Sequence, residues 1–238
     1  MTKESELPEA PQPRRRSGWI LWVLALLITM AAVVFQNRTG PTYPLEGSFT
    51  TSRGPVRFLF LRSENIGTDL AIVLRDPVPE SLRAQVRYRR YRSRDPWTVV
   101  PMQHGEFSVS RHGSSQTVSG LGVLLPSLKE RAGKYEYFVE VAEGDGPMQS
   151  VTGDRPVLAR YKAPVPGWAL ALHIVVIFLS MLLAVRVTLE ALFGLPSMRL
   201  LQLTVATLIL GGFILGPLVQ WYAFGVWWSG FPYGYDWT

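Results

Sequence analysis

Three long stretches that are nearly free of charge constrain this chain more than any other feature of its sequence. They cover residues 18–36, 167–187 and 199–220. Each is close to the roughly 20 residues that a helix needs to cross about 30 Å of hydrocarbon. Backbone polar groups find no water inside lipid, so each stretch is predicted to be helical. We therefore predict a membrane protein with three transmembrane helices.

The charges beside these stretches predict how the chain is oriented. The first apolar run is longer than the core of a typical signal peptide and lacks a small-x-small cleavage site beside it, which favours an uncleaved anchor. Arg14, Arg15 and Arg16 precede it, and arginines that flank an anchor stay in the cytoplasm. Residues 1–17 are then a flexible cytoplasmic tail, and the main domain and the C-terminus are extracytoplasmic. The short loop predicted between the second and third stretches holds Arg186 and Arg199 against one Glu190, which agrees with a cytoplasmic loop.

The segment between the first two stretches, residues 44–163, has the pattern of a β domain. Short runs rich in Val, Tyr, Phe and Leu alternate with turns rich in Pro, Gly, Asp and Ser. The number of such runs is typical of a small antiparallel sandwich. The predicted runs are 56–62, 69–75, 84–91, 97–102, 117–125 and 134–141.

Two parts of the chain resemble known proteins. The segment VRYRRYRSRDPWTVVPM and the later AGKYEYFVEV resemble a fibronectin type III or similar Ig-like domain. The resemblance implies that Val86 and Tyr88 share a strand, that Trp97 opens the next, and that Tyr135 and Tyr137 lie in a late core strand. The C-terminal YAFGVWWSGFPYGYDWT is similar to the YAFGxxWTGxPFGxDLT ending of uncharacterised bacterial membrane proteins with such a domain. This resemblance implies the architecture and carries no activity. The predicted location of the protein is the bacterial inner membrane.

Composition and motifs argue against several classes of function. The chain has no cysteine, so it has no disulfide, thiolate metal site or cysteine nucleophile. It carries no GxSxG, HExxH, Walker or GxGxxG motif, and His104 and His112 lie in a predicted turn region without a third metal ligand. We therefore predict that the protein is not an enzyme and holds no metal. Nucleic acid is not an expected partner, because the charged domain is outside the cytoplasm.

An arginine-rich run is the candidate binding surface of the β domain. One interpretation is a solvated strand face whose charges discourage edge-to-edge pairing. The other is a docking face for an acidic external protein or for anionic lipid, because guanidinium groups bind carboxylates and phosphates through two hydrogen bonds. The residues are Arg87, Arg89, Arg90, Arg92 and Arg94.

The third apolar stretch contains pairs of small residues four positions apart. Thr207 and Gly211 form one pair, and Gly212 and Gly216 form the other. Such pairs let helices approach closely in lipid, either within the chain or with other membrane subunits. Residues 221–238 are predicted to be an aromatic tail at the membrane interface, where aromatic rings are favoured. The predicted anchors to the bilayer are Trp19, Trp168, Trp221, Trp227 and Trp228.

A single histidine, His173, lies inside the second apolar stretch. A polar ring at that depth is expected to face protein, cofactor or water. It could bond to a neighbouring helix or reach the outer interface. Ala169, one turn earlier, makes a pattern that resembles bacterial light-harvesting polypeptides, in which the histidine binds bacteriochlorophyll. A haem or a proton relay are further alternatives.

These observations favour a non-enzymatic accessory or scaffold subunit that stabilises or assembles a larger bacterial membrane complex, with no cofactor. One alternative is a pigment-associated accessory subunit of a photosynthetic complex, with His173 as the ligand. Another is a membrane-anchored sensor whose β domain binds a ligand.

Overall fold

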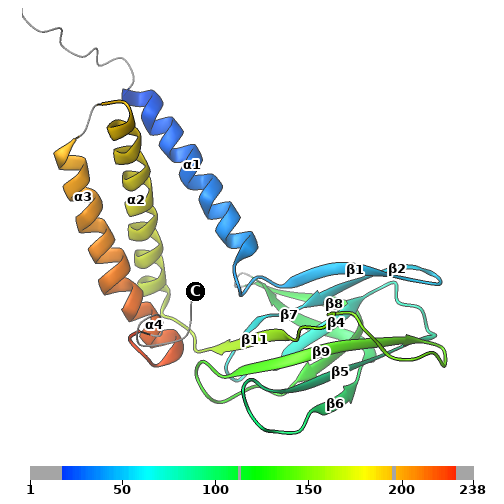
Figure 1. Ribbon diagram of the computed structural model, residues 1–238. Coiled ribbons are helices and arrows are strands. Elements are labelled where there is room, and N and C mark those ends of the chain that lie inside the picture. Colours follow the sequence, from blue (N-terminus) through cyan, green and yellow to red (C-terminus); the bar gives the residue numbers. More distant parts are fainter. Residues whose placement is uncertain (1–17, 112–113, 195–196, 229–238) are drawn as a thin grey trace, which may run out of the picture.

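The structure is a computed structural model that describes residues 18–111, 114–194 and 197–228. It has two parts: a helical unit, and a β domain that the chain forms between its first and second helices (Figure 1). The predicted flexible tail, 1–17, lies outside the described residues, as do His112 and residues 229–238 of the predicted aromatic tail.

The helical unit contains three helices that are long and apolar enough to cross a membrane. They are α1 (Gly18–Thr39), α2 (Gly167–Leu192) and a third span, Met198–Phe224. The second helix ends five residues beyond the predicted 187, at Leu192, so Arg186 and Glu190 belong to α2 and not to the loop that follows it. The third span continues to Phe224, so the first residues assigned to the tail 221–238 are helical.

The third span is not a uniform α-helix. It consists of α3 (Met198–Leu208), a π-helical segment η1 (Ile209–Leu215) and α4 (Gly216–Phe224). Pro217, at the start of α4, has no N–H to donate to the preceding turn, and its ring crowds the carbonyl four residues earlier. A widened turn relieves that conflict, and π-segments of this kind are common at functional sites.

The β domain contains two sheets. One has the order β1-β2-β4-β8-β7, and the other has the order β3-β11-β9-β5-β6 with β10 on β9. The pairing is antiparallel except between β3 and β11. The strands are β1 (Leu45–Thr51), β2 (Gly54–Phe60), β3 (Ser63–Asn65), β4 (Leu70–Arg75), β5 (Leu82–Arg90), β6 (Thr98–Pro101), β7 (Gln103–Arg111), β8 (Ser114–Leu125), β9 (Lys134–Glu143), β10 (Gln149–Ser150) and β11 (Val157–Lys162).

A single hydrophobic core lies between the two sheets. Alternate residues of β5 and β9, such as Val86 and Tyr137, point into it, while Phe60 and Ile72 enter from the other sheet. Tyr137 is fully buried and donates its hydroxyl to the carbonyl of Leu61 at 2.9 Å. Burial raises the pKa of the Tyr137 hydroxyl. This core stabilises the β domain without help from the helices.

The predicted turn around His104 was wrong. Residues Gln103–Arg111 form β7, an edge strand that pairs along its whole length with β8. Gly120 in β8 passes so close to β4 that a Cβ atom there would lie 2.0 Å from the Leu74 carbonyl oxygen. Only glycine permits this approach, which lets β8 curve around the core.

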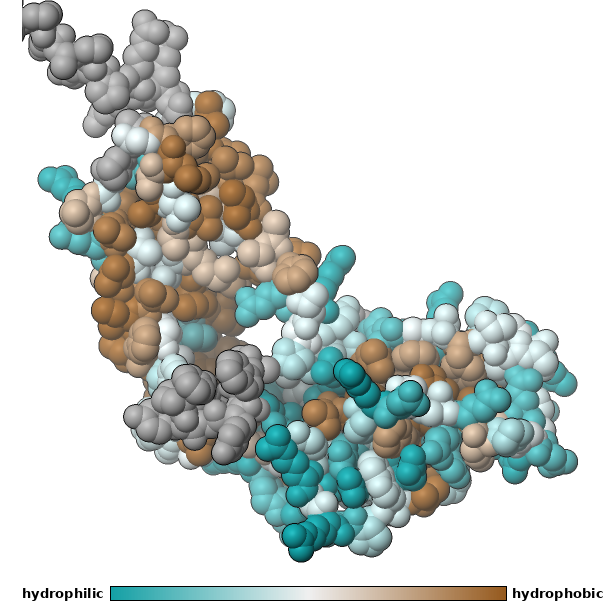
Figure 2. Space-filling view, viewed as in Figure 1, coloured by the Kyte–Doolittle hydropathy of each residue, from teal (hydrophilic) through white to brown (hydrophobic). Residues whose placement is uncertain are grey.

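The end of the third span lies against the β domain. The Ala163 N–H, just after β11, donates to the carbonyl of Ala223 in α4 at 2.9 Å. The guanidinium of Arg160 lies 5.3 Å from the ring centre of Phe224. Apolar side chains cover the visible face of the helical unit, whereas polar side chains predominate on the β domain (Figure 2).

Candidate functional site

The π-helical segment meets α2 at His173. The Nδ1 atom of His173 lies 3.0 Å from the carbonyl oxygen of Gly211, which also accepts the N–H of Gly216. A carbonyl oxygen can only accept, so Nδ1 carries the proton, and in the neutral imidazole Nε2 then keeps its lone pair. Within the described residues, Nε2 has no hydrogen-bond partner, and the side chain is half-buried. The imidazole is therefore held in one orientation with one nitrogen free to accept a proton or to bind a metal.

The structure separates the glycines that the sequence grouped together. Gly211 is buried, and a Cβ atom there would lie 3.2 Å from the backbone nitrogen of Ile177 in α2. At Gly212, by contrast, a Cβ atom would meet only Leu208, at 3.8 Å. Gly216 lies beside His173, because a Cβ atom added to Gly216 would lie 3.7 Å from Cε1 of His173. The close approach within the chain therefore depends on Gly211, while Gly212 lies on an outer face.

Thr207 and Ala169 both have neighbours within the chain. The Thr207 hydroxyl donates to the Leu203 carbonyl of its own helix at 2.8 Å, a bond that uses no neighbouring helix. Ala169 has 0% exposure, so protein already fills the space beside it.

An ion pair that the sequence analysis missed lies near the other end of α2. Arg186 Nη1 is 2.9 Å from Glu190 Oε1, one turn later, and both side chains are buried. The Arg186 guanidinium also lies 5.3 Å from the ring centre of Trp22 in α1. Arg186 Nε and Glu190 Oε2 are buried without hydrogen-bond partners. The signal was present in the sequence as opposite charges four residues apart in an apolar run.

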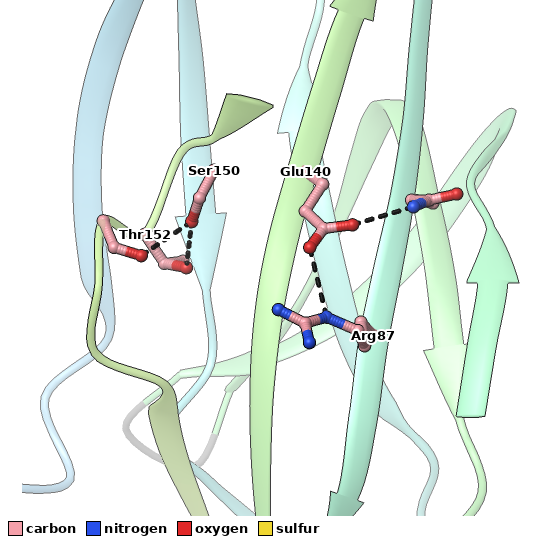
Figure 3. A network of polar contacts seen from close by, with 6 residues as sticks. Arg87, Glu140, Ser150 and Thr152 are labelled. Carbon is pink, nitrogen blue, oxygen red and sulfur yellow. Dashed lines mark hydrogen bonds and ion pairs between the residues drawn. The ribbon is translucent and has the colours of Figure 1, made fainter. Parts of the chain in front are cut away.

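The first three residues of the arginine-rich run, Arg87, Arg89 and Arg90, lie on β5, and each forms an ion pair within the chain. Arg87 Nε lies 3.1 Å from Glu140 Oε1 on the adjacent β9, as Figure 3 shows, and Arg89 Nε lies 2.5 Å from Glu136 Oε1. Their guanidinium groups also stack on the Trp97 ring, with Cζ 4.9 Å and 4.4 Å from its centre. This half-buried ladder of charges and rings favours a structural role for Arg87 and Arg89.

The remaining arginines of the run are more open. Arg90 forms an exposed pair with Glu130 at 2.8 Å, and this bond lowers the pKa of the Glu130 carboxyl. Arg92 has a positive φ of 57° and lies 5.2 Å from the Tyr91 ring centre. Arg92 and Arg94 are exposed, so they are the members of the run available to a partner.

The predicted tryptophan anchors lie at both ends of the helical unit. Trp19 begins α1, while Trp168 begins α2 at the end nearer the β domain, and both are exposed. Near the end of the third span, Trp221 stacks on Trp227 with ring centres 5.6 Å apart, and Trp228 stacks on Phe213 at 6.5 Å. Aromatic side chains at both ends of apolar helices are typical of the two interfaces of a bilayer.

No protein-family model, curated protein or solved structure matches the chain. The candidate sites therefore stand on the geometry of the chain alone.

Proposed function

We propose that the protein is an accessory or scaffold subunit of a larger bacterial membrane complex. Its three apolar helices would span the inner membrane with the N-terminus in the cytoplasm, and its β domain would lie outside. The arginines at 14–16 support this orientation, and the aromatic side chains at both ends of the helices support the membrane-spanning arrangement. Because the chain has no cysteine, a single cysteine placed at Ser93 and labelled by an impermeant reagent would test it.

The observation that carries this proposal is the outer face of the third span. Gly212 lies there within a π-helical segment and is half-buried, and a Cβ atom added to it would meet only Leu208, at 3.8 Å. Large side chains beside it are exposed, among them Phe213 and Ile214. A small residue on such a face lets the backbone of another helix come close, which is how membrane helices recognise one another.

We further infer an Ig or fibronectin III relationship for the β domain. The order β2-β4-β8-β7 corresponds to strands A-B-E-D of that fold, and β6-β5-β9-β11 corresponds to C′-C-F-G. This is a fold used widely for contacts between proteins, and it suits a subunit that bridges others outside the membrane.

The replacement Gly212→Leu tests the accessory role. It fills the open face without touching α2, so partner subunits should be lost when the chain is purified from its native membrane in mild detergent. Ala206→Leu adds similar bulk at another exposed position of α3 and serves as the matched control. If both variants retain the same co-purifying subunits as the wild type, the proposed interface is wrong.

A second candidate function follows from the free Nε2 of His173. A neutral imidazole whose other nitrogen donates to a carbonyl is the usual form of a histidine ligand, so a haem or a bacteriochlorophyll supplied by the complex could bind there. An absorption spectrum of the native complex, compared with that of His173→Leu, tests this idea. Loss of a visible or near-infrared band supports the ligand role, and unchanged bands exclude it.

A further inference from the structure

Two sets of arginines on the β domain differ in how the chain neutralises them. On β5, Arg87 and Arg89 each form an ion pair with a glutamate of the adjacent strand. On the other sheet, Arg57 of β2 is the direct cross-strand partner of Arg75 of β4. Directly opposed residues of adjacent strands point to the same face, so these two like charges are neighbours.

Nothing in the described part of the chain compensates this pair. No ion pair involves Arg57 or Arg75, and the Nε atom of Arg75 is buried without a hydrogen-bond partner. Like charges directly opposite one another destabilise a sheet, and a buried donor without a partner adds to that cost. Within the described residues, this arginine pair therefore has no acidic partner in direct contact.

A pocket of about 500 Å³ lies at this position. Arg53, from the turn between β1 and β2, joins Arg57 and Arg75 in its lining, and Asp76 is the acidic lining residue. Three positive charges and one negative charge leave the pocket with a formal charge of +2. The rest of the wall is largely apolar, with contributions from Val56, Pro77 and Val78.

We propose that this arginine pocket binds a phosphate-bearing ligand. A phosphate monoester carries a charge of about −1.5 to −2 at pH 7, which matches the pocket, and guanidinium groups bind phosphate through two parallel hydrogen bonds. The anion would lie between Arg57 and Arg75 and would accept the unused donor of Arg75. The apolar wall suits the carbon part of a small molecule or of a lipid headgroup. This inference does not depend on the accessory role.

The test uses the full chain in phosphatidylcholine nanodiscs, with inorganic phosphate as the soluble probe. Wild type should bind phosphate, measured by calorimetry, and the pocket variant Arg57→Gln with Arg75→Gln should bind at least about tenfold more weakly. The control Arg131→Gln with Arg155→Gln makes the same change of charge at exposed positions outside the pocket, and it should bind as wild type does.

A second arm distinguishes a lipid headgroup from a soluble ligand. If the phosphate belongs to a lipid, nanodiscs containing phosphatidylglycerol should slow hydrogen exchange in β2 and β4 of the wild type and the control, but not of the pocket variant. If neither inorganic phosphate nor phosphatidylglycerol distinguishes the pocket variant from the control, the proposal is overturned.

Thermal unfolding separates a binding role from a structural one. Without added anion, the pocket variant should unfold at a temperature at least as high as wild type, because the replacement removes a like-charge contact. Phosphate should raise the midpoint of wild type and control alone, because a ligand stabilises the state that binds it. A lower midpoint for the pocket variant in anion-free buffer, with no response of wild type to phosphate, would show that the arginines serve the fold.

Discussion

The β domain and the helical unit treat large apolar side chains in opposite ways. Phe60 in β2 has 0% exposure within the core, whereas Phe213 in η1 is 64% exposed. The β domain excludes water with its own residues and carries its own hydrophobic stabilisation. The helical unit turns most of its apolar surface outward, so its stability depends on what surrounds it, either lipid or other subunits.

The two parts also differ in the buried charges they contain. The helical unit pairs Arg186 with Glu190, next to Trp22. The β domain buries Glu64 without an ion pair within the described residues, with the N–H of Asn65 donating to its carboxylate at 2.8 Å. The helical unit thus holds its buried charges as an ion pair, whereas the carboxylate of Glu64 in the β domain is held by a backbone N–H.

The largest expected effect comes from truncating one phenylalanine in each part. Phe60→Ala should lower the free energy of unfolding of the β domain by about 3–5 kcal/mol, because it leaves a cavity in a closed core. Phe213→Ala should change the stability in detergent by less than about 0.5 kcal/mol, because the ring is already exposed. Thermal and denaturant unfolding of the full chain in detergent measures both. Similar losses for the two variants would remove the distinction between the parts.

Breaking the ion pair of the helical unit should have the next largest effect. Arg186→Met leaves the Glu190 carboxylate buried without its partner, at a cost of about 3 kcal/mol in helix stability. Adding Glu190→Met should restore most of that loss, since no charge then remains buried. Detergent titration followed by circular dichroism measures both variants. A double variant as unstable as the single one would show that the charges are not coupled.

Filling the contact between α2 and η1 should have a smaller effect. Gly211→Leu should cost about 1–3 kcal/mol, because the new side chain pushes the third span away from Ile177. It should also break the bond to His173, visible as a mixed tautomer in ¹⁵N NMR of the imidazole. Gly212→Leu is the matched control, and it should leave both stability and tautomer unchanged. Equal effects of the replacements at Gly211 and Gly212 would mean that the contact between α2 and η1 does not depend on Gly211.

The smallest effect is expected from Glu64 and depends on pH. Burial raises the pKa of the Glu64 carboxyl, partly offset by the Asn65 N–H and by Lys162. The folded state thus holds the proton more tightly than the unfolded state. Its contribution to stability is present below the ordinary glutamate range and is lost as the pH rises through the raised value. Glu64→Gln should remove this decline, so its midpoint relative to wild type should increase from pH 4 to pH 7. A Gln variant that loses stability over that range would contradict this prediction.

Local sequence pattern predicted those helices and strands that can be recognised from one property of a short stretch of sequence. The three helices were predicted from long stretches without charge. Strands such as β5 and β9 were predicted from the alternation of apolar and polar residues. The strand β7 was missed because Gly105 and its polar neighbours have the composition of a turn, while its pairing with β8 depends on residues farther along the chain. The short strands β3 and β10 carry too few residues to show any period.

For the candidate sites, the sequence pointed to particular residues but did not predict the contacts that those residues make. A spacing of four residues grouped Gly212 with Gly216, but the π-turn changes which residues share a face and brings Gly211 inside instead. The histidine was recognised in the sequence, but its partner, the Gly211 carbonyl within that widened turn, was not.

The sequence by itself determined where the chain is apolar and which strands alternate, because both properties are repeated within a short window. Only the tertiary structure decided which charges are neutralised. Arg87 and Arg89 meet Glu140 and Glu136 because β5 pairs with β9 in one register. Arg57 faces Arg75 for the same reason in the other sheet. Strand register is a property of the whole fold, since a shift of one residue would turn every side chain to the opposite face.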